Sequence, residues 1–506
     1  MLYIAIYPED YTIDKNDLTR QWIAQGFISK VHGIDPEDVA KSYFNELINR
    51  SMIQPTKTDF DGEVLCFRVH DMMLDLILHK SQEENFLTII DNVLEMTVQH
   101  DKIRRLPLHL DGATNDDRAL RSVQLSHIRA VARFGIPMYL PPFLLFKHLR
   151  VLTIEVPQGR PLTDVLDFTG ICHLFQLGYL KIMASRHGVA LPSKIGSLQQ
   201  LETFHLETNV SFPNVHCREL PLDIAHISRL SDGLENMKSL RTLRGLNMCW
   251  GSPNNVKGLR ELTNLTDLEI RWYHNKGISI SCDEAAARGR VKFCNLRYLY
   301  LRRCPANVSL AVSKSAHASF CHLQRFRADF SWFSRVPEWI GELHNLYDLD
   351  LTVKEVLDDD IGVLAGLPSL TRLRFHILAS LRERITVPGS AFPVLEHFTF
   401  ICRKVWYLTL EATAMTKLKR LELAFLEKGW DRYHTLPVGI EHLPSLREIS
   451  LRIGNCGDTE SCRQAAESAL RNAVDKHPGR TTSIRCDTCS DYIFDDVGIV
   501  IYGGYR

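Results

Sequence analysis

The sequence VPEWIGELHNLYDLDL at residues 336–351 carries apolar side chains at every third position and then switches to strict alternation. A spacing of three fits a tight helical or 3₁₀ turn, whereas alternation fits a short strand. Pro337 stands at the start of the turn, where its missing N–H group leaves no hydrogen bond unmade. The stretch therefore predicts one turn followed by one strand.

The same pattern recurs along most of the chain, in full at residues 191–206 (LPSKIGSLQQLETFHL) and 436–451 (LPVGIEHLPSLREISL). The strand half, L-x-x-L-x-L, recurs mostly at intervals of 23 to 31 residues, with one interval of 39, and its first leucines are Leu120, Leu149, Leu177, Leu201, Leu240, Leu265, Leu296, Leu323, Leu346, Leu370, Leu395, Leu418 and Leu446. A leucine-rich helical protein would instead space its leucines at i, i+3, i+4 and i+7. The observed period predicts an α/β fold, a leucine-rich-repeat solenoid with a parallel inner sheet.

The x positions of L-x-x-L-x-L are predicted to point outward from that sheet, and they mix charged and aromatic side chains. Such a mixture is typical of surfaces that recognise proteins. Trp339 and the other aromatic residues near the strands fit two interpretations, as anchors for a partner or as packing beneath the next coil. We expect the arginines to face solvent, and the predicted partner-binding residues are Arg271, Trp272, Tyr273, Tyr300, Arg302, Trp332, Asp350, Arg374 and His376.

Composition excludes several other classes of protein. The chain has 506 residues, of which 45% are apolar and 24% charged, so it is globular rather than disordered. Sixty basic residues balance sixty acidic ones, which gives no global attraction to nucleic acid or to an anionic membrane. No run of eighteen apolar residues predicts a membrane span, and no basic segment precedes the apolar start as in a secretory signal.

The thirteen cysteines show no framework spacing, which fits a reducing compartment, so we expect a cytoplasmic protein or a nuclear one. Cys486 and Cys489, with Cys456 and Cys462, offer four thiolates, but the spacing is wrong for a zinc ribbon, and we predict no metal site. No phosphate-binding P-loop, G-x-S-x-G elbow or H-E-x-x-H helix occurs. The sequence therefore predicts no enzyme.

The first hundred residues do not follow the repeat. Asp14 is predicted to begin a helix that Gly26 ends, and Asp35 with Pro36 is predicted to begin a second helix. Residues 63–69 read as a strand, and a third helix is expected to begin near His70 and Asp71. Two helices, a strand and a third helix in this order suggest a small winged-helix module.

These residues also resemble those of a known family, the plant intracellular nucleotide-binding, leucine-rich-repeat disease resistance proteins. LYIAIYPEDY at residues 2–11 is similar to the family segment that ends in F-P-E-D-Y, and QWIAQGFI at 21–28 is similar to W-I-A-E-G-F-I. YFNELINRSMIQ at 43–54 is similar to Y-x-x-E-L-x-x-R-S-L-I-Q, and VHD at 69–71 is similar to M-H-D. The resemblance covers the whole chain and is nearest to the coiled-coil subclass.

In that family the histidine of M-H-D contacts the β-phosphate of ADP and locks the resting state. The resemblance gives this role to His70, with Asp71 holding the local geometry; the alternative is that His70 only caps the helix. Because the P-loop is absent and Met1 falls inside the first motif, we expect the C-terminal part of such a receptor, with a truncated winged helix. We therefore expect no binding of ADP or ATP by this chain alone.

Three domains are predicted: a winged-helix domain at 1–95, the repeats at 96–460, and a capping helix with an irregular tail at 461–506. The resemblance implies a non-enzymatic recognition module in plant defence. Its partners would be a pathogen effector or a guarded host protein, and a nucleotide-binding domain in cis or in trans. The alternatives are an F-box leucine-rich adaptor of a ubiquitin ligase, which would need an N-terminal L-P-x-x-x-L module, and a secreted receptor ectodomain.

Overall fold

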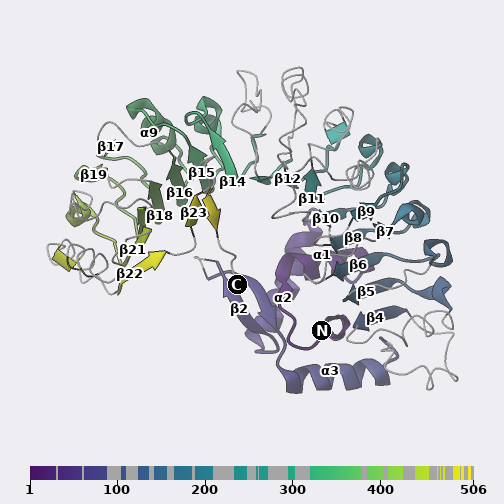
Figure 1. The fold of residues 1–506 in the computed structure, drawn as a ribbon. Coiled ribbons are helices and arrows are strands. Elements are labelled where there is room, and N and C mark those ends of the chain that lie inside the picture. The colour runs from purple at the N-terminus through teal and green to yellow at the C-terminus, as the bar shows by residue number, and fades with distance from the viewer. Residues whose placement is uncertain are drawn as a thin grey trace. The chain divides into compact units, whose positions relative to one another are not determined.

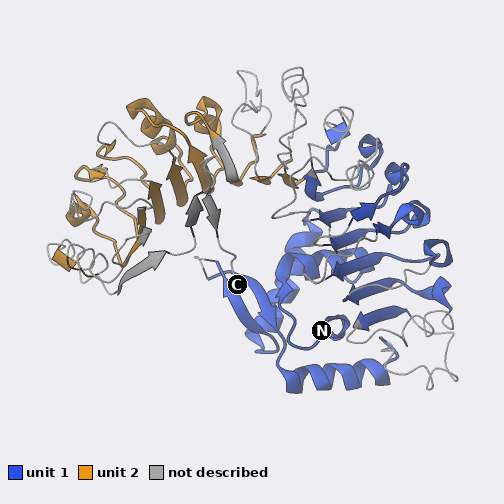
Figure 2. Cartoon of the chain, viewed as in Figure 1, with its two compact units in different colours: residues 1–265 blue, residues 266–506 orange. Residues whose placement is uncertain are grey.

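The computed structural model divides the chain into two compact units, residues 1–265 and residues 266–506 (Figure 2). The residues that the structure describes are 1–29, 32–59, 62–87, 104–109, 124–135, 142–156, 165–184, 188–208, 233–247, 258–259, 261–271, 295–302, 320–378, 385–402, 408–425, 439–454, 464, 468, 471–472, 483–489, 492–494 and 500–502. None of the helices within these ranges is long and apolar enough to cross a bilayer.

Unit 1 begins with three helices and a small antiparallel sheet (Figure 1). After the 3₁₀ helix η1 (Leu2–Ile6) come β1 (Ile13–Asp14), α1 (Lys15–Gln25), α2 (Pro36–Asn49), β2 (Gln54–Thr58), β3 (Val64–Arg68) and α3 (Asp71–Glu83). The sheet order is β1-β3-β2. This arrangement confirms the predicted winged-helix module. The sequence did not reveal β2, because all five of its residues are exposed and carry no apolar alternation.

Capping side chains fix the first two helices where the sequence predicts them. The Asp14 carboxylate accepts hydrogen bonds from the backbone N–H groups of Asn16 and Asp17 in α1 at 2.8 and 3.0 Å. The chain leaves α1 at Gly26 with φ 79°, a conformation that glycine adopts without strain. Asp35 caps α2 in the same way through the Glu37 N–H at 3.1 Å, and Pro36 occupies the first helical position.

The rest of unit 1 is a ladder of parallel strands, one for each repeat. Their order is β4 (Arg105–His109), β5 (Ala130–Phe134), β6 (Val151–Val156), β8 (Tyr179–Ala184), β10 (Thr203–Glu207) and β11 (Thr242–Asn247). Away from this sheet, β7 (Val165–Asp167) pairs in parallel with β9 (Gly188–Ala190).

Unit 2 continues the same design. Its parallel strands are β12 (Asp267–Arg271), β13 (Tyr298–Arg302), β14 (Arg325–Phe333), β15 (Asp348–Val353), β16 (Arg372–Ile377), β18 (His397–Cys402), β20 (Arg420–Phe425), β21 (Glu448–Gly454) and β22 (Ser483–Cys489). A separate parallel pair joins β17 (Ile385–Val387) to β19 (Leu408–Leu410), and β23 (Tyr492–Phe494) pairs antiparallel with β24 (Val500–Tyr502). One helix, α9 (Asp358–Ala365), lies between β15 and β16 in sequence.

The predicted solenoid repeat is confirmed. From Leu149 to Leu446, every predicted first leucine stands two residues before a strand, and each of these leucines is buried. The expected tight turns are 3₁₀ helices, namely η5 (Phe143–Leu145), η6 (Thr169–His173), η7 (Ile195–Ser197), η8 (Leu234–Asn236), η9 (Glu338–Glu342) and η10 (Ile440–His442). Full burial of a leucine or isoleucine side chain contributes about 1.5–3 kcal/mol, so the stacked leucines hold the coils together.

The ladder is longer than the sequence predicted at both ends. Leu120 and most of the expected helix at 461–474 lie outside the described residues, as do the predicted boundaries near residues 95 and 460. β5 follows the buried Ile128 rather than a leucine, so a search for leucine alone misses it. The tail is not irregular as predicted, because β22 pairs in parallel with β21. Its sequence, SIRCDTC, contains no leucine to reveal it.

Candidate functional site

His70 and Asp71 stand at the start of α3 with exposed side chains. The His70 carbonyl accepts the backbone N–H groups of Met73 and Leu74 at 2.8 and 2.9 Å, but its imidazole makes no capping hydrogen bond. His70 therefore caps α3 through its backbone carbonyl and not through its side chain. Its ring stays available at a helix N-terminus, where anionic groups are favoured.

The exposed side of α3 next to His70 carries two large apolar side chains. Met72 is 79% exposed and Leu76 is 51% exposed, and a spacing of four residues puts both on one side of the helix. Exposed large apolar side chains on a folded domain often mark a contact surface. His70 thus stands beside a surface suited to another protein domain.

The opposite side of the winged-helix module shares one hydrophobic core with the repeats of unit 1. This core joins Tyr3, Ile6 and Trp22 of the module to Phe134 of β5 and Tyr179 of β8, all of them buried. α1 contacts both β6 and β8 (Figure 1). The two parts of unit 1 therefore cannot separate without exposing aromatic and aliphatic side chains to water.

A buried ion-pair network lies within that interface. Lys181 of β8 bonds to Asp17 of α1 at 2.7 Å and to Glu155 of β6 at 2.6 Å, and all three side chains are nearly inaccessible to solvent. The Tyr11 hydroxyl donates a hydrogen bond to the other oxygen of Glu155. Burial of Tyr11 and the negative charge of Glu155 raise the pKa of the phenol. One lysine thus links two segments of the module to two strands of the repeats.

Two further contacts tie the end of α1 to the repeats. The Gln25 side-chain amide donates to the Arg129 carbonyl at 3.0 Å, and Arg150 donates to the Gln25 carbonyl at 3.1 Å. At Gly178, which precedes β8, an added Cβ atom would lie 3.2 Å from the Cβ of Ala24. The close approach of α1 to the sheet therefore depends on a small residue at this position.

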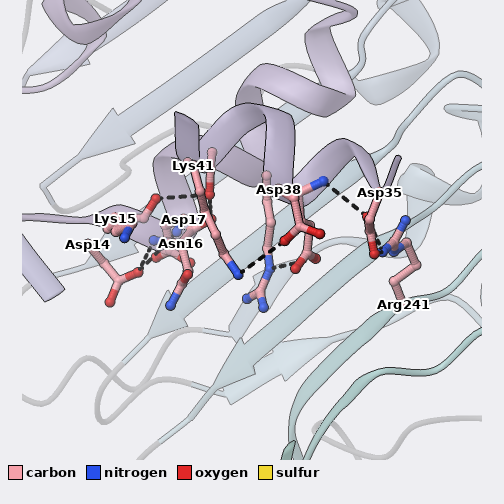
Figure 3. A network of polar contacts seen from close by, with 11 residues as sticks. Asp14, Lys15, Asn16, Asp17, Asp35, Asp38, Lys41 and Arg241 are labelled. Carbon is pink, nitrogen blue, oxygen red and sulfur yellow. Dashed lines mark hydrogen bonds and ion pairs between the residues drawn. The ribbon is translucent and has the colours of Figure 1, made fainter. Parts of the chain in front are cut away.

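An ion pair holds the start of α2 to Arg241, the residue just before β11 (Figure 3). Arg241 donates to both carboxylate oxygens of Asp35 at 2.7 Å, while Asp35 also caps α2. Burial opposes the charge of Arg241, but the hydrogen bond to Asp35 and the nearby Glu37 raise its pKa overall. One carboxylate therefore serves both local helix formation and tertiary docking.

We expect Asp35→Ala to lower the free energy of unfolding by about 1–2 kcal/mol, because it removes the helix cap and the ion pair together. Asp35→Asn keeps a capping oxygen and should lose less than half as much. Urea denaturation of both variants measures the difference. Equal losses would show that the cap contributes nothing.

A basic cavity of about 560 Å³ opens in unit 1, beyond the last turn of α3. Guanidinium groups and imidazoles from successive repeats line it, together with the side chains of Glu84, Asn85 and Gln176. Burial of Arg129 and the positive charges of Arg104 and Arg150 lower its pKa. The cavity therefore favours an anionic group.

The structure places the predicted partner-binding residues of unit 2 as follows. Trp272 and Tyr273 lie outside the described residues, and for Trp332 only the backbone, paired with β15, is described. Trp339 packs against Phe320 and Phe326, which confirms the packing interpretation for this tryptophan. The remaining predicted residues, Arg271, Tyr300, Arg302, Asp350, Arg374 and His376, lie on the strands between β12 and β16.

The expectation that the arginines face solvent is wrong for Arg271, which is 6% exposed and bonds to Glu269 at 2.7 Å. His376, another predicted partner-binding residue, is 4% exposed. Stacked strands lie about 4.8 Å apart, so side chains on their outward faces cover one another. Position in the repeat alone does not reveal how deeply such a side chain lies.

Register places charges of opposite sign side by side on β14, β15 and β16. At the first strand position the neighbours are Arg325, Asp348 and Arg372, and two residues later they are Arg327, Asp350 and Arg374. Asp348 is almost fully buried, and one of its oxygens forms ion pairs with Arg325, Arg327 and Arg372 at 2.8, 2.9 and 3.3 Å. The predicted residues Asp350 and Arg374 lie two positions further along β15 and β16 and pair with each other at 3.9 Å.

Sequence reasoning missed the docking residues of unit 1, foremost Asp17, Glu155 and Lys181. A weak signal exists for Lys181, a lone charge within the apolar strand YLKIMA. Nothing in the sequence connects it with Asp17, which is 164 residues away and is joined to it only by the fold.

Comparison with known proteins places this architecture in a family. Residues 127–483 match the family described as the leucine-rich repeat region, and residues 6–77 match the disease resistance protein winged helix domain. Among solved structures, an internalin (inlF) from Listeria monocytogenes aligns over 67% of this chain and 81% of its own, at 15% identity and a TM-score of 0.39.

The relatives are disease resistance proteins of plants. RGA5 of Oryza sativa subsp. japonica is 35% identical over 492 residues, which cover 94% of this chain and 44% of RGA5. Pik-2 of the same species is 26% identical, over 90% of this chain and 49% of its own. In Arabidopsis thaliana, the putative RPP13-like protein 2 is 26% identical, over 83% and 49%. This chain spans about half the length of these relatives, and it belongs to the nucleotide-binding, leucine-rich-repeat disease resistance proteins of plants, with their winged-helix domain and their repeats.

Proposed function

We propose that this chain is the recognition part of a plant immune receptor. Its repeats bind a pathogen effector or a guarded host protein, and its winged-helix domain passes the event to a nucleotide-dependent switch. The module is non-enzymatic and acts in the cytoplasm. The observation that supports this proposal most is the shared core and buried ion-pair network between the winged helix and the repeats of unit 1.

The shared core gives a physical route between partner binding and the switch. A partner that displaces the first repeats must also displace α1, because Asp17, Lys181 and Glu155 are buried together. Packed cores resist continuous deformation, so such a displacement moves the module as a whole. His70, at the start of α3, moves with it.

Within the part of the chain that the structure describes, the contact proposed for ADP is His70. The free imidazole of His70 at the N-terminus of α3 suits a phosphate oxygen. Bound nucleotide would supply the negative charge that His70 contacts. A glycine-rich loop to bind the phosphates is absent from the sequence. His70 therefore acts as a sensor only beside a nucleotide-binding domain, which the exposed Met72 and Leu76 would contact.

The test joins this chain to an upstream nucleotide-binding half and expresses it transiently in leaves. His70→Ala should trigger cell death without any effector, because the resting state loses its phosphate contact. His79→Ala is the matched control, since His79 is an exposed histidine on the same helix and should leave the leaf healthy. Immunoblots confirm equal protein levels. An inert His70→Ala, or equal cell death with His79→Ala, would contradict the proposal.

A further inference from the structure

On the outward face of unit 2, arginines lie above the carboxylates with which they pair. Arg327 is 38% exposed over Asp348 at 2%, and Arg302 is 34% exposed over Glu269 at 9%. Four other pairs, Arg325–Asp348, Arg372–Asp348, Arg374–Asp350 and Arg452–Glu422, follow the same order, whereas Arg271 and Glu269 are both buried. In these pairs the arginine therefore lies nearer to solvent than the carboxylate that it contacts.

The layer that a partner meets is therefore cationic, most of all over β13 to β16. Tyrosine rings border the guanidinium groups there: Arg302 lies 5.2 Å from the Tyr300 ring, and Arg325 lies 5.7 Å from those of Tyr298 and Tyr347. Arginine and tyrosine dominate the binding energy of many protein interfaces.

The buried carboxylates also fix the arginines in place. Asp348 lies between Arg325 and Arg372 in register and bonds to both, so these side chains lose little conformational freedom when a partner binds. The exposed arginines run from Arg302 on β13 to Arg374 on β16, which is three strand spacings or about 14 Å. A row of this length suits several carboxylates along one segment better than a single phosphate group.

We propose that the outward face of β13 to β16 binds an acidic protein segment, whose aspartate and glutamate side chains lie against the exposed positive charge of Arg302, Arg325, Arg327 and Arg374. The inference deepens the proposed function, because it names the chemistry of the protein partner that the repeats would recognise.

The test measures binding of a fluorescent ten-residue polyglutamate peptide to the full chain by anisotropy. The peptide should bind, more weakly as salt rises, and a polyglutamine peptide of equal length should not. The double variant Arg302→Gln and Arg327→Gln should raise the Kd at least tenfold. Circular dichroism and thermal melting confirm that each variant is folded.

Two controls test whether the peptide binds this face specifically or any positively charged part of the chain. Arg335→Gln with Lys417→Gln removes two exposed positive charges away from the face; Arg335, like Arg327, bonds to a buried aspartate, here Asp360 of α9. Arg129→Gln removes a charge from the basic cavity of unit 1. Both controls should raise the Kd less than twofold.

Two results would overturn the inference: no binding of polyglutamate to the wild-type chain, or losses in the controls as large as in the double variant. Neither result would touch the proposed function, which the His70→Ala cell-death assay tests by itself. Conversely, if His70→Ala caused no cell death while the peptide still bound, the proposed function would be contradicted and the acidic-segment inference would not be.

Discussion

Lys181→Met is expected to lower the free energy of unfolding of unit 1 by about 3–5 kcal/mol, the cost of removing one partner from a buried ion pair. Asp17 and Glu155 would remain buried next to each other without the ammonium group that bonds to both. Methionine fills a similar volume, so a lost cavity contact contributes little. Urea denaturation measures the loss.

Two further variants give this prediction its specificity. Lys194→Met removes an exposed lysine of the same unit and should change stability by less than about 0.5 kcal/mol. Asp17→Asn should cost less in the Lys181→Met background than in the wild type, by about 0.5–3 kcal/mol, because the two side chains interact. Additive losses in the double variant would contradict a direct Asp17–Lys181 interaction.

The same pair sets an expected pH dependence. Burial opposes the Asp17 carboxylate, but the Lys181 ammonium outweighs it and holds the Asp17 pKa below its ordinary value of 3.8. Burial likewise opposes the Lys181 ammonium, but Asp17 and Glu155 raise its pKa well above 10.5. The stabilisation by Asp17 is therefore lost only as pH falls below about 4, and that by Lys181 only as pH rises above about 10. Between pH 5 and 8 this ion pair should therefore contribute no change in stability.

Asp348→Asn is expected to destabilise unit 2 by about 2–3 kcal/mol, because it leaves three converging arginines without their shared charge. The figure is smaller than for Lys181 because these guanidinium groups are 10–38% exposed and water screens them. Asp350→Asn is the matched control, since Asp350 is more exposed and contacts Arg374 at 3.9 Å. It should cost less than about 1 kcal/mol.

Thermal melting of both aspartate variants distinguishes the two sites. A larger loss for Asp350→Asn than for Asp348→Asn would show that burial depth does not govern these rows of charge. The same result would weaken the assignment of Asp348 as the residue that fixes the arginines above it.

The sequence predicted the repeats well because their physics is local. A leucine two residues before a strand is buried by its own coil and the next, so Leu149 or Leu446 can be recognised without knowing the rest of the fold. The capping residues Asp14 and Asp35 are local in the same sense, because each bonds to backbone atoms two or three residues away. Such signals survive in any tertiary context.

The candidate sites were less predictable, because they depend on depth and on contacts between distant segments. Position in L-x-x-L-x-L shows that Arg271 points outward, but not that Glu269 bonds to it below the surface. Lys181 and Asp17 meet only because the winged helix packs on the repeats. Register on neighbouring strands, which a single sequence does not contain, decides these contacts.

The winged helix and the first repeats of unit 1 should form one cooperative body, which hydrogen exchange of backbone amides in the wild-type chain can test. We expect amides of α1, such as those of Leu18 and Trp22, to open with the same free energy as those of β8, within about 1 kcal/mol. Exchange of the α1 amides through openings at least about 2 kcal/mol cheaper than those of β8 would contradict it.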